Sequence, residues 1–239
     1  MIRIKAAMFD MYGTLAGFDP PRDQIQHRAA LKFGIDINRD RIDTGYHLAD
    51  EFMAKQNSTK PLRTMNGNEQ WAFFSRYEQL VLQGSGHEVD LSLAGEIWAE
   101  IRKQEYRITL FSDVLDGLRR LRSSGLTVGV VSNMNSTGDS LCEEMGLIQE
   151  IDFVVTSGET GYEKPAPRIF EVAIEKAGMD ASQIVFVGDQ IESDIKGADN
   201  VGLNPILIDR FNGHPTYVDH PRATDMDSTI AIIDNMNAS

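Results

Sequence analysis

The chain has 239 residues and a net charge of −13, because 36 aspartates and glutamates outnumber 23 lysines and arginines. An acidic surface repels phosphate backbones and anionic lipids, so we expect neither nucleic acid nor a membrane as a partner. The single cysteine, Cys142, excludes an intramolecular disulfide and a cysteine-based metal cluster. The sequence also has no apolar run of about 18 residues, the length that a membrane-spanning helix needs. The acidic charge, the single cysteine and this lack together favour a cytoplasmic protein that acts on a small molecule. The sequence carries no signal for the oligomeric state.

The first half of the chain predicts one strand and then only helices. Ile4–Phe9 is short and apolar and runs into Asp10 and a glycine turn, as a buried strand does. Beyond it, apolar residues recur at helical spacing, and the predicted helices are Gln24–Phe33, Asp43–Lys55, Glu69–Leu82 and Leu91–Gln104. Residues 17–106 are therefore predicted to be a helical domain without strands, inserted after the first strand.

The second half predicts a strict alternation of helix and strand. Helices are expected at Val114–Ser123, Ser136–Met145, Pro167–Ala177 and Glu192–Val201, and strands at Thr127–Val131, Phe153–Thr156, Ile184–Val187 and Pro205–Ile208. Short apolar strands between amphipathic helices are typical of a parallel sheet covered on both faces. We therefore predict an α/β fold, a doubly wound parallel sheet formed by residues 1–16 and 107–239, with the helical domain as an insertion.

Polar residues follow the predicted strands where such a sheet binds its ligands, at the carboxyl ends. Asp10 follows the first strand, and a carboxylate in that place can act as a nucleophile and form a covalent ester, although turn formation is the simpler role. Ser132 and Asn133 offer a hydroxyl and an amide that suit an anionic oxygen, or that cap the next helix.

Two more carboxylates, Asp189 and Asp194, follow another of the predicted strands. Each could cap the local turn or helix. Together with Asp10 they would repel one another in a site of low dielectric constant, and a cation would relieve that repulsion. Mg²⁺ prefers carboxylate oxygens and often binds through one or two of them together with a substrate phosphate. Asp10, Asp189 and Asp194 are therefore the predicted metal ligands.

Four motifs resemble, in order and spacing, those of the haloacid dehalogenase-like hydrolases: Phe9-Asp-Met-Tyr-Gly-Thr-Leu15, Val131-Ser-Asn133, Glu163-Lys-Pro-Ala-Pro167 and Val187-Gly-Asp-Gln-Ile-Glu-Ser-Asp194. The resemblance implies a Rossmann-like core, an inserted helical cap of the first cap class, and Asp10 as nucleophile. It further implies that the Tyr12 carbonyl binds the metal. Thr14, Ser132, Asn133 and Lys164 would then bind the substrate, and Tyr12, Ser132 and Lys164 would join Asp10 as catalytic residues.

Tyr12 departs from the phosphatases of that superfamily, which usually carry at this position an Asp that protonates the leaving group. A phenol is a poor general base at neutral pH. Asp-x-Tyr-Gly-Thr resembles the metal-independent 2-haloacid dehalogenases instead, for which Arg41 would be the substrate-binding arginine. The acids of the last motif favour a Mg²⁺-dependent phosphatase of a small phosphorylated metabolite. The alternatives are a 2-haloacid dehalogenase and a catalytically weak binding or regulatory protein.

Overall fold

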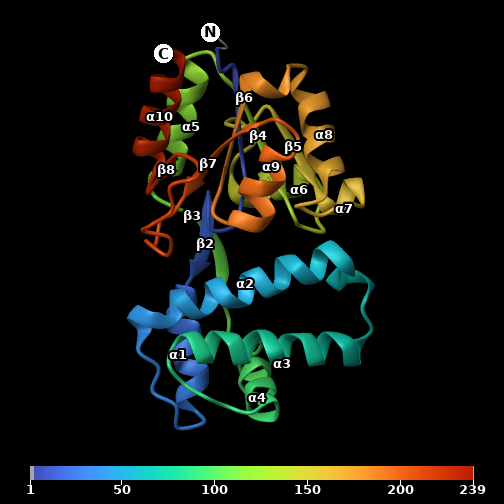
Figure 1. Cartoon of the computed structure of the whole chain (residues 1–239), viewed down its shortest axis with the longest axis vertical. Coiled ribbons are helices and arrows are strands. Elements are labelled where there is room, and N and C mark those ends of the chain that lie inside the picture. Colours follow the sequence, from blue (N-terminus) through green and yellow to red (C-terminus); the bar gives the residue numbers. More distant parts are fainter. Residues whose placement is uncertain (1–2, 239) are drawn as a thin grey trace. The chain divides into compact units, whose positions relative to one another are not determined.

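The computed structural model describes residues 3–238. The chain divides into two compact units: Phe18–Ile108 form one, and the residues up to Gly17 together with those from Thr109 onward form the other. We call them the helical unit and the sheet unit, and Figure 1 shows the elements of each. The chain passes between the units twice, once after Gly17 and once after Ile108.

The sheet unit is built on six parallel strands in the order β5-β4-β1-β6-β7-β8. The strands are β1 (Ala6–Phe9), β4 (Thr127–Ser132), β5 (Phe153–Thr156), β6 (Ile184–Gly188), β7 (Asn204–Ile208) and β8 (Arg222–Ala223). Phe9 at the end of β1 pairs with Val130 of β4 and Val187 of β6. This register places the residues that follow the three central strands at one edge of the sheet, and it confirms the predicted α/β class.

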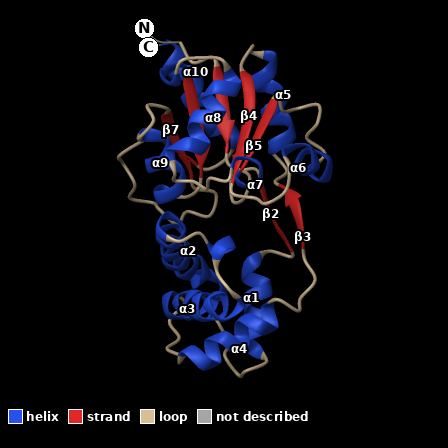
Figure 2. Cartoon of the chain, turned by 90° about the vertical axis from the view of Figure 1, so that its right-hand side faces the viewer, coloured by secondary structure: helices blue, strands red, loops and turns tan. Residues whose placement is uncertain are grey.

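Helices cover both faces of the sheet, as Figures 1 and 2 show. They are α5 (Val114–Ser123), α6 (Gly138–Met145), α7 (Ser157–Thr160), α8 (Pro167–Ala177), α9 (Lys196–Asp199) and α10 (Met226–Ala238). Met8 of β1 is fully buried in a cluster with Phe170 of α8 and Phe186 of β6, whose rings meet edge to face at 5.1 Å. Since alternate strand residues face opposite sides, a strand covered on both faces must be apolar throughout, as β1 is.

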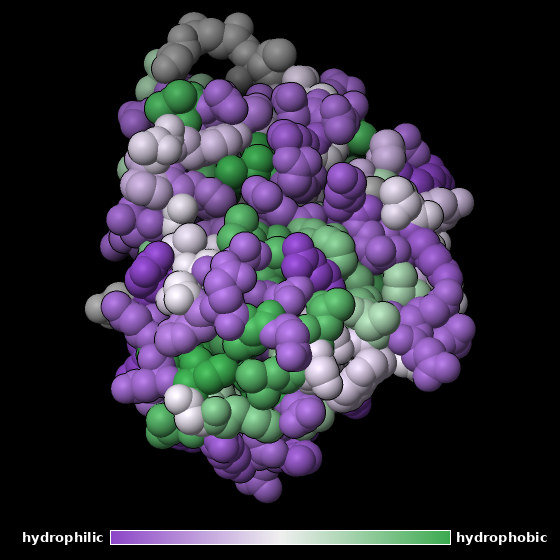
Figure 3. All heavy atoms as spheres, turned by 60° about the horizontal axis from the view of Figure 1, so that its bottom comes forward, coloured by the Kyte–Doolittle hydropathy of each residue, from purple (hydrophilic) through white to green (hydrophobic). Residues whose placement is uncertain are grey.

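The helical unit consists of α1 (Arg22–Leu31), α2 (Ile42–Thr59), α3 (Gly67–Gly84) and α4 (Leu91–Ile101), with short 3₁₀ turns at Arg39–Arg41 and Leu62–Thr64. Asn66 and Glu69 form a capping box that starts α3, and Asp90 caps α4. In the view of Figure 3, which turns the lower end of Figure 1 forward, apolar residues gather in patches bordered by hydrophilic ones. No helix between residues 3 and 238 is long and apolar enough for a membrane span.

The structure differs from the sequence-based prediction around the junctions of the units. The region 17–106 was expected to lack strands, yet β2 (Ala16–Asp19) enters it and pairs with β3 (Arg107–Leu110), so that prediction is wrong at this point. The predicted helix Glu192–Val201 is a π-helical turn, Ile191–Ile195, followed by the short α9. Strand β8 and helix α10 were not predicted.

Candidate active site

Asp10 lies directly after β1, and its side chain is buried at the carboxyl edge of the sheet. Its backbone N–H donates to the carbonyl of Val187 in β6 at 2.9 Å, which extends the β1–β6 pairing by one residue. The chain then folds back on itself, because the amides of Leu15 and Ala16 both donate to the Met11 carbonyl. We call residues 10–16 the Asp10 loop. The strand and this closed loop together hold the carboxylate in one place.

Lys164 brings two carboxylates together. Its Nζ donates to Asp10 Oδ1 at 2.5 Å and to Asp194 Oδ1 at 2.7 Å, and its side chain is only 3% exposed. The ammonium also lies over the ring of Phe186, 5.5 Å from the centroid. Residues from the first, third and fourth motifs therefore meet, although 154 positions separate Asp10 from Lys164.

The pKa values of this group follow from burial and from neighbouring charge. Burial raises the pKa of Asp10 to about 6; the Lys164 ammonium opposes this shift and Asp194 adds to it. Burial by itself would lower the pKa of Lys164, but Asp10 and Asp194 more than offset it and raise that pKa. Lys164 is therefore a permanent positive charge beside Asp10.

Asn133 holds the backbone of Lys164 from both sides. Its Nδ2 donates to the Lys164 carbonyl at 3.0 Å, and its Oδ1 accepts the Lys164 N–H at 2.7 Å. From the sequence we expected Asn133 to bind the substrate, and this contact with Lys164 was missed. The two residues lie 31 positions apart, so no local pattern links them. Ser132, the last residue of β4, lies buried at the same edge. Substrate binding by Ser132 and Asn133 stays a prediction.

Asp10, Asp189 and Asp194 can hold a cation, since one carboxylate oxygen from each lies within 4.8 Å of the other two. Asp194 is fixed on the π-helical turn, where its Oδ2 accepts the N–H of Gln190 at 3.0 Å. Three carboxylate oxygens form the hard donor set that Mg²⁺ prefers. The single ammonium of Lys164 leaves the carboxylates in excess, so the residues present fit the predicted metal.

Tyr12 and Thr14 lie in the Asp10 loop. Tyr12 is partly exposed, and its backbone forms an isolated bridge with Ala16. Thr14 is fully buried, and its hydroxyl makes no hydrogen bond within residues 3–238. The loop thus brings the backbone of Tyr12 near Asp10. No contact of the Thr14 hydroxyl within the described residues explains why a threonine stands at this position. Their predicted roles in metal and substrate binding stay predictions.

Arg41, the arginine expected under the dehalogenase alternative, lies in the helical unit. It ends the 3₁₀ turn Arg39–Arg41, is exposed, and its guanidinium lies close to Gly86. Substrate binding by Arg41 stays a prediction.

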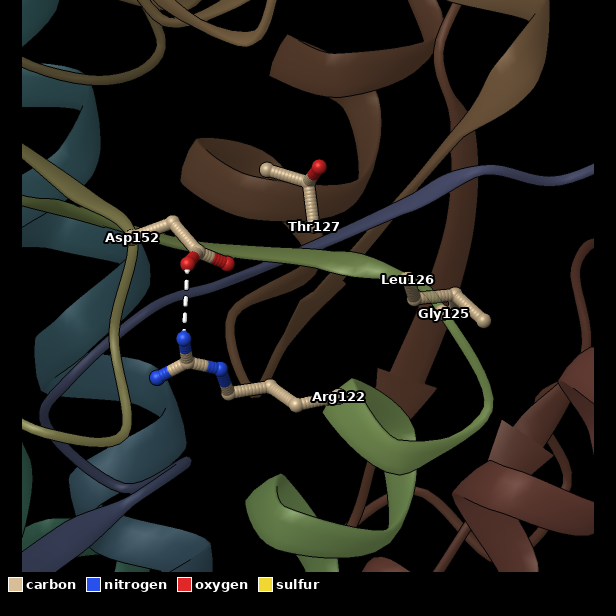
Figure 4. Close-up of a pocket in the computed structure, with 5 residues that line it drawn as sticks. All are labelled: Arg122, Gly125, Leu126, Thr127 and Asp152. Carbon is tan, nitrogen blue, oxygen red and sulfur yellow. Dashed lines mark ion pairs between the residues drawn. The ribbon is translucent and has the colours of Figure 1, made fainter.

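Two pockets in the sheet unit are not lined by these carboxylates, although the second includes Ile191 from the π-helical turn that carries Asp194. One, of about 400 Å³, is lined by Arg122, Gly125–Thr127 and Asp152 at the amino ends of β4 and β5, the opposite edge from Asp10. Figure 4 shows the Arg122–Asp152 ion pair, 3.0 Å long, that neutralises its charged lining. The other, of about 310 Å³, is formed by Ile191 and residues 213–219. Neither contains the residues expected to carry the chemistry.

Comparisons with known proteins agree with this geometry. A ribulose-1,5-bisphosphate 5-phosphatase of Halopiger xanaduensis is 30% identical over 85% of this chain and 84% of its own. A glyceraldehyde 3-phosphate phosphatase of Methanothermobacter thermautotrophicus is 29% identical over 95% of both chains. The L-2-haloacid dehalogenase of Xanthobacter autotrophicus shares the fold, with a TM-score of 0.60, 19% identity, and coverage of 98% of this chain and 99% of its own.

The sequence pattern of the haloacid dehalogenase-like hydrolases matches residues 4–202. That span includes Asp10, Lys164, Asp189 and Asp194, so the match covers every residue of the carboxylate–lysine group. The resemblance seen in the four motifs is confirmed, and the chain belongs to the haloacid dehalogenase-like hydrolases.

Proposed function

We propose that this hydrolase is a Mg²⁺-dependent phosphatase of a small phosphorylated metabolite, with Asp10 as its nucleophile. The observation that carries the proposal is the meeting of Asp10, Asp189 and Asp194 around one point, with Lys164 against two of them. Two relatives of nearly the same length bear the names of sugar-phosphate phosphatases, which supports the substrate class. The core would be residues 1–16 and 107–239, with residues 17–106 acting as a cap.

In the proposed reaction a carboxylate oxygen of Asp10 attacks phosphorus, and the bond from phosphorus to the ester oxygen breaks with its electron pair leaving on that oxygen. Lys164 donates to Asp10 and supplies fixed positive charge to the phosphoryl oxygens. Water then attacks the aspartyl phosphate, phosphate leaves, and the Asp10 carboxylate is regenerated. Mg²⁺ held by Asp10, Asp189, Asp194 and the Tyr12 carbonyl would neutralise phosphoryl charge.

Tyr12 restricts which leaving groups this site can release. The departing oxygen of an alkyl phosphate needs a proton, and Tyr12 replaces the carboxyl group that would supply it. An aryl or acyl phosphate has a leaving oxygen that is stable as an anion, so its departure needs no acid. We therefore infer that the enzyme turns over aryl and acyl phosphates faster than alkyl phosphates.

The same Tyr12 favours a second function, 2-haloacid dehalogenation, in which Asp10 would attack carbon and halide would leave without a proton. Against it, Asp194 and Asp189 add negative charge where an anionic haloacid would have to bind. A third function, binding of a phosphorylated ligand with little turnover, needs the fold and Lys164 but no acid–base group.

One panel separates the three functions. Wild-type protein is assayed with alkyl, aryl and acyl phosphates and with 2-haloacids, each with Mg²⁺ and with excess chelator. Ribulose-1,5-bisphosphate and glyceraldehyde 3-phosphate belong in the panel because the relatives named above act on them. The control is Asp10→Asn, which keeps the side-chain volume and removes the nucleophile, and thereby identifies activity from a contaminant.

We expect phosphate release that requires Mg²⁺ and disappears in Asp10→Asn. Halide release that persists in chelator would replace the proposal with dehalogenation. If nothing in the panel turns over but a phosphorylated compound raises the melting temperature, the protein is a binding protein. Wild-type turnover in Asp10→Asn would refute the nucleophile assignment.

A further inference from the structure

Arg210 reaches into the Asp10 loop from the opposite end of the sequence. It follows Asp209 at the end of β7, and its Nε donates to the carbonyl of Thr14 at 2.8 Å, across 196 positions of sequence. The Arg210 side chain is only 8% exposed. The loop closes on itself through the Met11 carbonyl, and the Thr14 carbonyl ties it to the rest of the sheet unit, as the Asp10 N–H does through Val187.

The other end of the guanidinium is held by Asp113. Nη1 of Arg210 lies 3.1 and 2.9 Å from the two carboxylate oxygens of Asp113. An Asp at the start of a helix usually caps it, yet the Asp113 side chain makes no cap hydrogen bond to α5. It accepts instead from Arg210 and from the N–H of Met226. Asp113 thus orients Arg210 and also binds the first backbone N–H of α10.

An aromatic ring completes the support. The Arg210 guanidinium lies over Phe111, 4.4 Å from the ring centroid, and the N–H of Phe111 donates to the Leu15 carbonyl at 3.0 Å. The same ring packs on Gly17, where an added Cβ would lie 2.9 Å from it. Arg210 therefore touches the end of the Asp10 loop, which leads into β2, and the residue that follows β3.

We propose that Arg210 is a positioning residue for catalysis, which holds the Asp10 loop, and with it the nucleophile, through the Thr14 carbonyl. The proposal rests on the proposed function only for its effect on turnover. Arg210 serves its two acceptors from two different nitrogens, Nε toward the Thr14 carbonyl and Nη1 toward Asp113. The single ammonium of a lysine does not reproduce the spacing of this rigid fork. Arg210 touches neither Asp10 nor Lys164 and acts only through the loop.

Hydrogen exchange of the full-length protein tests the positioning independently of any substrate. The probe is a peptide covering Met11–Ala16, whose protected amides are Gly13, Leu15 and Ala16. We expect these amides to exchange about tenfold faster in Arg210→Met, since one anchoring hydrogen bond is lost. Arg210→Lys keeps the charge but loses the Thr14 contact, so it should show the same acceleration with a smaller loss of melting temperature.

Arg122→Met is the matched control. Arg122 also bridges a backbone carbonyl, that of Gln149, and a carboxylate, but at the opposite edge of the sheet. The carboxylate is that of Asp152 (Figure 4). Exchange of Met11–Ala16 should be unchanged in this variant. Equal acceleration in Arg122→Met, or none in both Arg210 variants, would overturn the proposal. If Arg210→Met does not fold, Arg210→Lys decides the question alone.

Turnover is the second readout. With Mg²⁺ at saturation, a misplaced nucleophile lowers kcat by about 10²-fold and changes KM much less, because the reacting oxygen contributes more to the transition state than to substrate binding. We expect this split in both Arg210 variants and full activity in Arg122→Met. If wild type itself hydrolyses nothing, the proposed function fails while the exchange result still decides on Arg210. If wild type is active and both Arg210 variants keep full kcat, Arg210 is not a positioning residue.

Discussion

Gly13 lies directly against the carboxylate of Asp189, so closely that a Cβ at position 13 would overlap the Asp189 oxygens. The backbone of Gly13 has a φ of 81°, in the left-handed region that disfavours residues with a side chain. The Asp10 loop and the fourth motif thus meet through a glycine, and no larger residue allows the proposed metal ligands to approach one another in this way.

Gly13→Ala should therefore cost both stability and activity. The left-handed backbone costs about 1–2 kcal/mol for a residue with a Cβ, and the overlap displaces Asp189 from Asp10 and Asp194. We expect a weaker apparent affinity for Mg²⁺, measured by titrating the metal in the activity assay, and a lower free energy of unfolding in denaturant.

Gly125→Ala is the control for the backbone effect. Gly125 has a φ of 87°, but a Cβ there meets nothing within 4 Å. This variant should lose stability of similar size and keep wild-type Mg²⁺ dependence. If Gly13→Ala and Gly125→Ala had the same Mg²⁺ dependence, the contact with Asp189 would have no part in metal binding.

Most of the sheet unit could be predicted because its signals are local. An apolar strand followed by a polar residue marks a strand end, and parallel strands bring their ends together whatever the distance in sequence. Asp10, Asp189 and Asp194 were found in this way, whereas Lys164 was assigned only through the family resemblance of its motif. The pair β2 and β3 was missed because neither is an apolar run like β1: β2 contains a glycine and ends in Asp19, and β3 begins with the exposed Arg107.

Contacts that depend on tertiary packing have no such signal. Arg210 looks like any arginine after a strand, and only the fold shows that its partner is the Thr14 carbonyl. Asn133 suits a ligand oxygen as well as it suits the Lys164 backbone, so its residue type could not distinguish the two. A hydrogen bond to a backbone carbonyl cannot be predicted from the residue type of the acceptor, since every residue has such a carbonyl.

Asn133→Ala tests the clamp on Lys164. Two hydrogen bonds to the Lys164 backbone disappear, which should lower the free energy of unfolding by about 1–3 kcal/mol and reduce kcat, because the ammonium beside Asp10 is less well placed. Asn204→Ala is the control: the Asn204 side chain likewise makes two hydrogen bonds to the backbone, although it donates both, to the carbonyls of Ser182 and Ile184. It should lose similar stability and keep its kcat. A normal kcat in Asn133→Ala would show that Lys164 needs no clamp.

Tyr12→Asp should restore the missing acid–base group. For a phosphatase we expect kcat/KM to rise for alkyl phosphates, toward the about 10²-fold that such catalysis contributes, and to change little for aryl phosphates. Tyr12→Phe separates the loss of the phenol from the gain of a carboxylate and should not raise alkyl turnover. If Tyr12→Asp instead depressed release of halide from a haloacid that wild type accepts, the site would be that of a dehalogenase. Equal wild-type rates on alkyl and aryl phosphates, unchanged in Tyr12→Asp, would show that another group supplies the proton.

The helical unit contains a buried acid whose titration should make its stability depend on pH. Glu78 on α3 is 1% exposed, and its partner is the amide of Gln26, which also accepts from the hydroxyl of Tyr46 at 3.2 Å. Burial raises the pKa of Glu78 to about 8 from an ordinary 4.5, although the Gln26 hydrogen bond lowers it. Between these two values the folded chain keeps a proton that the unfolded chain has released.

Stability should therefore fall as pH rises through that window, by at most about 1.4 kcal/mol per pH unit from this group. Below it both states are protonated, and above it both are ionised, so the contribution of Glu78 becomes flat. Glu78→Gln mimics the protonated acid and should be more stable than wild type near the upper end of the window, with a weaker pH dependence in denaturant unfolding. Glu51→Gln, at an exposed position of α2, should keep the wild-type dependence. If Glu78→Gln and wild type lost stability in parallel as pH rises, Glu78 would already be ionised in the folded protein.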